Sequence, residues 1–325
     1  MAEKWDKDET FSYGNGESLS ADDLNDTLGL MIDGRLYGDG SDGALSVPSG
    51  TTNLTLNQTY NYTTISVTAG AILTTSDANG TGLPLILKCQ GDCSIEGTLT
   101  VLGKGAAGGL GDGETPVQYV TTLGDQNVSL PGTKGTDSPI YSTANGGGGG
   151  GASLLNDGAN GAGTGPGTGG TAHCVIYRGL GSMVCIGGTG GGQGGAGTGT
   201  GGYQDGGGGG AGGGSIILFV GGDLTVGASG TISAKGVDGG RGGHSSGFNT
   251  RGGAGGGGGG GGNLYIYYKG TYTNSGTVSA DGGTGGTGGN GNPDPQYHGG
   301  VGGAGGNGRT DIQKTSDKRW NNVFR

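Results

Sequence analysis

Short apolar runs separated by turns recur along the chain in one fixed order. The clearest copy runs from Ser215 to Gly242, where the apolar run Ile216–Val220 is followed by a glycine turn, by Leu224–Val226, and by Gly-Thr-Ile-Ser at 230–233. Glycine tracts follow that last element. The same order recurs at 85–109 and at 263–289. Short runs rich in β-branched and apolar residues are typical of strands. The pattern therefore predicts an internal repeat of strand, turn, strand and Gly-Thr-apolar-Ser/Thr.

The sequence also predicts β structure in the region before the first repeat. Its runs are rich in threonine and apolar residues and are bounded by Gly, Pro and Asn, which favours short strands joined by turns. These runs are Leu45–Val47, Asn53–Leu56, Tyr60–Val67 and Ala71–Thr74.

The first 35 residues have a different pattern. Ser20 precedes two aspartates, and leucines follow at helical spacing, which predicts a short helix capped by the serine side chain. A lone helix of this length is marginal in water, so it should dock on another surface; a frayed terminus is the alternative. We predict an attachment segment whose contacts are made by Trp5, Phe11, Leu24 and Leu28.

Composition changes the picture most through glycine, which accounts for 92 of the 325 residues, while apolar residues make up only 30%. A conventional side-chain core is short of material, and the lack of a strict G-X-Y period excludes collagen. A disordered linker is one interpretation. The runs GGTGGTGGNG and GGVGGAGGNG favour another, polyglycine II helices that pack by two bare faces and bond backbone to backbone.

The predicted fold is therefore all-β with glycine-rich polyglycine II helices, built from elongated β-solenoid-like or sandwich repeats after a short N-terminal helix. A thin rod of this kind has little core, which favours a homotrimer; a single-chain protein is the alternative. Five segments are predicted. They are an attachment segment 1–35, a β-rich domain 36–111 holding the first repeat, an insertion loop 112–145, a glycine-rich domain 146–308 and a C-terminal tail 309–325.

The net charge and the absence of targeting signals limit the classes of partner and the cellular location that we expect. The net charge of −10 gives no basic stripe to neutralise phosphates, so we expect no nucleic acid partner. No apolar run approaches the roughly 20 residues that a membrane helix needs, and the first residues contain no apolar signal segment. We expect synthesis in a cytoplasm and export, if any, by a route such as lysis.

The four cysteines form two local pairs, Cys89 with Cys93 and Cys174 with Cys185. Each pair could close a disulfide across a hairpin; free thiols are the next interpretation, and the spacing does not match a zinc site. His173, His244 and His298 are scattered, and no nucleophile or orienting acid accompanies them. We predict no enzyme activity, no metal and no cofactor.

The strands TISVTAGAILTTS and TYTNSGTVSADGGTGGTGG resemble those of tail-fibre and other minor structural proteins of tailed phages. The glycine-rich half is similar in kind to the polyglycine-sandwich adhesins at the tips of long tail fibres, and GNGESLSADDLNDTLG is similar to phage attachment segments. The resemblance implies a virion protein that joins other virion proteins through its N-terminal segment and binds a host-surface receptor through loops. The alternatives are a head fibre or fibre shaft without a receptor, and a polysaccharide-degrading tailspike.

Loops on a stiff scaffold commonly carry binding, and exposed Tyr, Arg and Phe are frequent contact residues. The candidate receptor-binding residues are Tyr119, Tyr141, Tyr177, Arg178, Tyr203, Phe248, Arg251, Tyr297 and His298.

Overall fold

The computed structural model of this chain describes part of its length. The described residues are 10–12 and 18–20 by their backbone, and 36–56, 58–75, 84–109, 147–153, 156–163, 166–169, 191–192, 194–197, 204–245, 250–292 and 297–315. The predicted N-terminal helix, the insertion loop 112–145 and Cys174 with Cys185 all lie outside these ranges. In the N-terminal segment, β1 (Thr10–Ser12) pairs antiparallel with β2 (Ser18–Ser20).

The other fifteen described strands form three parallel sheets of five. Sheet I contains β3 (Ala44–Val47), β6 (Thr64–Val67), β9 (Cys93–Ile95), β12 (Leu224–Val226) and β15 (Tyr272–Asn274). Sheet II contains β4 (Thr51–Leu54), β7 (Ile72–Thr75), β10 (Thr98–Thr100), β13 (Thr231–Ser233) and β16 (Thr277–Ser279). Sheet III contains β5 (Thr59–Tyr62), β8 (Pro84–Cys89), β11 (Ser215–Val220), β14 (Asn263–Tyr268) and β17 (Arg309–Lys314).

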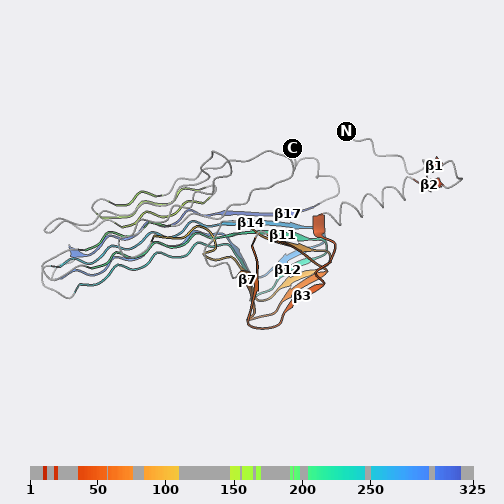
Figure 1. The fold of residues 1–325 in the computed structure, drawn as a ribbon, viewed down its shortest axis with the longest axis horizontal. Coiled ribbons are helices and arrows are strands. Elements are labelled where there is room, and N and C mark those ends of the chain that lie inside the picture. Colours follow the sequence, from red (N-terminus) through yellow and green to blue (C-terminus); the bar gives the residue numbers. More distant parts are fainter. Residues whose placement is uncertain are drawn as a thin grey trace.

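Strands that follow one another in the chain belong to different sheets, and every third strand returns to the same sheet. Each coil therefore contributes one strand to each sheet, and successive coils stack in register, which is the arrangement of a β-solenoid (Figure 1). Of the two predicted alternatives, the solenoid is the one that fits. The predicted repeats are stacked coils, with Ile216 paired both to Leu85 and to Leu264.

The structure differs from the sequence-based prediction in two places where segments were divided. The run predicted at 60–67 is split into β5 and β6, because the chain turns a corner at Thr63 between sheets III and I. The β-rich segment 36–111 and the glycine-rich segment 146–308 are also not separate in space, since each sheet takes strands from both, and β17 begins the tail. Hydrogen bonding between coils brings these distant segments together.

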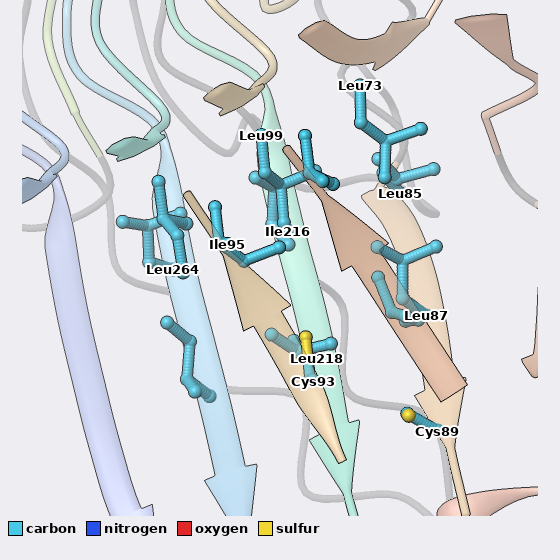
Figure 2. Packing of buried hydrophobic residues seen from close by; sticks show 14 of the residues in the cluster. Leu73, Leu85, Leu87, Cys89, Cys93, Ile95, Leu99, Ile216, Leu218 and Leu264 are labelled. Atoms are coloured by element: carbon cyan, nitrogen blue, oxygen red, sulfur yellow. The ribbon is translucent and has the colours of Figure 1, made fainter. Parts of the chain in front are cut away.

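The interior between the sheets is a continuous apolar core. Inward-facing side chains alternate with outward-facing ones, so that Leu85 and Leu87 of β8 lie beside Ile216 and Leu218 of β11 (Figure 2). Complete burial of each such side chain contributes roughly 1.5–3 kcal/mol to the free energy of unfolding. The sequence-based expectation underestimated the apolar core, because the apolar residues are concentrated in a few short strands and not spread along the chain.

The long glycine tracts leave the solenoid after β10, β13 and β16 and return to β11, β14 and β17. They run side by side away from the sheets in extended conformation (Figure 1). We call these hydrogen-bonded segments the glycine array; its members are 103–109, 147–153, 156–163, 166–169, 191–197, 204–214, 234–245, 250–262, 280–292 and 297–308, of which residue 193 is not described.

Segment 252–262 occupies the centre of the glycine array. Its N–H groups donate, every third residue in turn, to three neighbours: 297–306, 234–243 and 192–195. Its carbonyl groups accept in the same rotation from three others, which are 283–289, 207–213 and 148–151. The central segment thus has six hydrogen-bonded neighbours, which accounts for the burial of its backbone polar groups.

This position explains why the central segment is glycine everywhere except Ala254. A Cβ on Gly257 would lie 2.0 Å from the carbonyl oxygen of Gly149, and one on Gly255 would lie 1.9 Å from that of Gly286. At the periphery, one residue in three carries a side chain that faces solvent. These include Asp281, Thr284, Thr287, Val301 and Ala304.

The predicted disulfide between Cys89 and Cys93 is not formed: both side chains are buried free thiols. The expected hairpin does not exist, because Cys89 ends a strand of sheet III and Cys93 begins a strand of sheet I (Figure 2). The Cys89 thiol instead lies 3.3 Å from the carbonyl oxygen of Asp92 and 3.4 Å from that of Gly91, as a weak donor to both. Burial raises the pKa of Cys89 to about 11 and that of Cys93 well above its ordinary value.

We therefore expect both thiols to be unreactive in the folded protein. With a pKa of about 11, only roughly 0.1% of Cys89 is thiolate at pH 8. In a Cys174→Ser, Cys185→Ser variant, Ellman's reagent should label neither remaining thiol under native conditions and both in denaturant. An intact mass two hydrogens lighter than the reduced chain would contradict this.

The same shift sets a pH dependence. Because the folded state holds the Cys89 proton more tightly than the unfolded state does, its contribution to stability is fully present below the ordinary pKa of 9.0. That contribution is lost as the pH rises from there through about 11. The free energy of unfolding should fall over this window, and Cys89→Ala should make the fall shallower.

Candidate tip site

The far end of the glycine array brings together the described ends of segments that are remote in sequence. Residues 197 and 204 form an isolated antiparallel bridge there, as do Thr250 and Asn292. The connections 198–203, 246–249 and 293–296 follow directly from these residues and lie outside the described ranges. The glycine array runs away from the sheets, so this end is well separated from them (Figure 1).

We define the tip as the described residues that border these connections: Gln204, Asp205, His244, Ser245, Thr250, Arg251, Asn290, Asn292, Tyr297 and His298. They come from three pairs of outgoing and returning segments that hydrogen-bond to one another. Backbone hydrogen bonds therefore hold the segments of the tip together, and the side chains at the segment ends provide the groups that could contact a partner.

Arg251 and Tyr297 form the most defined side-chain contact of the tip. The guanidinium carbon of Arg251 lies 5.5 Å from the centre of the Tyr297 ring, a cation–π arrangement. Arg251 is only 5% exposed, and burial lowers its pKa from the ordinary value. The N–H of Gly252 donates to the carbonyl oxygen of Tyr297 over 3.1 Å, which fixes the two segments in register.

A second set of contacts joins the outgoing segments. The N–H of Asn290 donates to Nδ1 of His244 over 2.9 Å, and the N–H of Ser245 donates to the carbonyl oxygen of Asn290 over 2.9 Å. The hydroxyl groups of Ser245 and Thr250 also contact each other. Since Nδ1 accepts a hydrogen bond, a neutral His244 carries its proton on Nε2. The His244 and Asn290 side chains are exposed and so accessible to a partner.

The structure thus brings three of the sequence-predicted residues to one place: Arg251, Tyr297 and His298. Tyr203 and Phe248 fall on connections that border the tip and lie outside the described residues, as do Tyr119, Tyr141, Tyr177 and Arg178. Of the predicted attachment residues, only Phe11 is described, by its backbone in β1; Trp5, Leu24 and Leu28 are not.

Sequence reasoning did not single out Asn290 or Asn292. The signal was present, because Asn290 occupies the third-residue position of GGTGGTGGNG, the position whose side chain faces solvent at the end of an outgoing segment.

In the described ranges, no group of three or more His, Cys, Asp or Glu side chains is placed to hold a metal ion. Nor do these ranges contain a helix long and apolar enough to cross a membrane. The carboxylate of Asp92 accepts a hydrogen bond from the N–H of Asp223 over 2.8 Å and so supports the stacking of coils.

Comparison of the chain with protein-family models, with curated proteins and with solved structures gave no significant match.

Proposed function

We propose that this chain is a non-enzymatic fibre or tail-tip protein of a phage virion that binds a host-surface receptor through the tip. The observation that carries the proposal is that the described residues bordering three connections meet at one end of the hydrogen-bonded glycine array, at a distance from the sheets. A scaffold that positions loops at the end of a projection suits recognition better than catalysis.

The scaffold is part of this proposal. We interpret the glycine segments as polyglycine II helices. The three-residue rotation of their hydrogen bonds and their six-neighbour packing support that interpretation. In a loose tether, by contrast, nothing would keep Arg251 against Tyr297 at the end of segments this long.

The remaining parts of the proposal concern assembly. We propose that the N-terminal segment 1–35 joins other virion proteins and that the fibre is a homotrimer. The low apolar content favours a trimer, whereas the apolar interior of the solenoid gives each chain a core of its own. Sedimentation of the purified chain tests the trimer directly.

Receptor binding through the tip predicts a local loss of function. Tyr297→Ala should weaken binding of the fluorescently labelled chain to host cells by roughly tenfold or more, because aromatic and arginine anchors carry much of the energy of an interface. His298→Ala at the same end should also weaken binding. Titration of labelled protein on a panel of bacterial cells measures both.

Thr284→Ala is the matched control, since Thr284 is exposed on the side of the array rather than at its end. It should bind like the unchanged protein and keep its thermal midpoint, and Tyr297→Ala should remain folded by circular dichroism at the temperature of the binding assay. If the unchanged chain binds no cell while antibody to 204–308 decorates the particle, the alternative of a head fibre or shaft without a receptor gains support. Release of reducing sugar from host polysaccharide would instead favour a tailspike.

A further inference from the structure

The last coil of the solenoid leaves one edge of each sheet open among the described residues. The edge strands there are β15, β16 and β17. Tyr272, Val278 and Ile312 on these strands pack against the core but are only partly buried. An open parallel edge with apolar side chains at its end is a template for a further strand.

The spacing of the coils says which residues would reach that edge. The first residue of a sheet III strand and the first residue of the next sheet I strand are nine residues apart in three coils: Pro84 to Cys93, Ser215 to Leu224 and Asn263 to Tyr272. The same step from Arg309 of β17 leads to Lys318. Sheet I and sheet II strands begin five residues apart at Cys93 and Thr98 and at Tyr272 and Thr277, and seven residues apart at Leu224 and Thr231. The five-residue step of the neighbouring coil, from Tyr272 to Thr277, leads from Lys318 to Val323.

The residue types at these positions match the repeat. Asp317 falls where Asp92 and Asp223 stand, directly before a sheet I strand. Both of those carboxylates accept a hydrogen bond from a backbone N–H of the next coil. The N–H of Asp223 donates to Asp92 over 2.8 Å, and the N–H of Thr271 donates to Asp223 over 2.6 Å.

The apolar positions match as well. By this count Phe324 corresponds to Leu99 and Ile232, which lie at the centres of sheet II strands and are both fully buried. Trp320 falls at the place of Ile95 and Val226, also fully buried. Lys318 is the exception, at a place held by Cys93 and Leu224. A lysine at a sheet edge discourages pairing with a further chain.

From this register we propose that the solenoid edge is a docking surface for the chain's own residues 318–325. Residues 318–320 add in parallel to β15, and residues 323–325 add in parallel to β16. Phe324 and Trp320 then cover Val278 and the end of the core. The proposal is independent of receptor binding, since it concerns the end of the sheets and not the tip.

Trp320 provides a local probe, because the chain has two tryptophans and Trp5→Phe leaves it alone. In that background the acrylamide quenching constant should be at least about twofold lower for the native chain than for the chain in denaturant. Phe324→Asp should raise it to the denatured value. Arg319→Asp, which places the same charge at the outward position of Thr225 and Thr273, should leave it low.

Equal quenching in the native and denatured chain would overturn the proposal, as would a Phe324→Asp variant that remains protected. A second copy of the chain is the other possible occupant of the edge. Protection that disappears on dilution, together with a dimer in sedimentation, would assign the edge to that second copy and also overturn the proposal.

Discussion

Gly256→Ala should destabilise the protein by on the order of 3 kcal/mol or more, although it adds a single methyl group. A Cβ at this position would lie 2.1 Å from the carbonyl oxygen of Gly208 and 2.5 Å from its carbonyl carbon. Both are backbone atoms of a neighbouring segment, so no side-chain rotation relieves the contact. Gly256 also lies in the central segment, where a shift would disturb hydrogen bonds to several neighbours at once. The loss should appear as a lower thermal midpoint and a lower yield of folded protein.

Gly243→Ala is the matched control within the same array. The atoms nearest to its Cβ, the carbonyl oxygen of Asp205 and Oε1 of Gln204, lie 3.3 Å away, and one of them ends a flexible side chain. This change should alter the free energy of unfolding by less than about 1 kcal/mol. Equal effects of the two substitutions would mean that close packing of backbones does not hold the array together.

Leu218→Ala should cost about 3 kcal/mol, the second largest effect we expect. Leu218 lies at 0% exposure in β11, paired to Leu87 on one side and to Ile266 on the other. Removing three carbons at the centre of the stack leaves a cavity that neighbouring strands, fixed by their hydrogen bonds, cannot close. Denaturant unfolding followed by circular dichroism measures the change.

Thr225→Ala, at a partly exposed position of β12 between buried Leu224 and Val226, is the control and should change stability by less than about 0.5 kcal/mol. If Leu218→Ala were equally mild, the solenoid interior would not be the folding core of the chain.

The coil repeat could be predicted from the sequence because each coil is marked by a short local pattern. Ile216, Leu85 and Leu264 each begin an apolar run followed by a turn and the Gly-Thr-apolar-Ser/Thr element, and the structure stacks these runs in register. The two earlier coils were harder to recognise. They lack glycine excursions, and a one-residue corner at Thr63 joins two strands into what looks like one run.

The candidate site could be predicted only in part from the sequence. Arg251, Tyr297 and His298 were selected by residue type, but sequence alone could not say that they share one end of the array. That depends on the equal lengths of outgoing and returning segments and on hydrogen bonds between them. The predicted disulfide between Cys89 and Cys93 was wrong for a related reason: CQGDC resembles a hairpin, and only the sheet assignment shows a corner between two sheets.

Hydrogen–deuterium exchange of residues 252–262 tests most directly whether backbone bonds between glycine segments replace a side-chain core. Because these amides donate to neighbouring segments and lie at the buried centre of the array, they should exchange at least about a thousandfold more slowly than a free peptide. Exchange at the rate of a free peptide would show the segments to be a slack tether, and the rigid display of the tip would then have no physical basis.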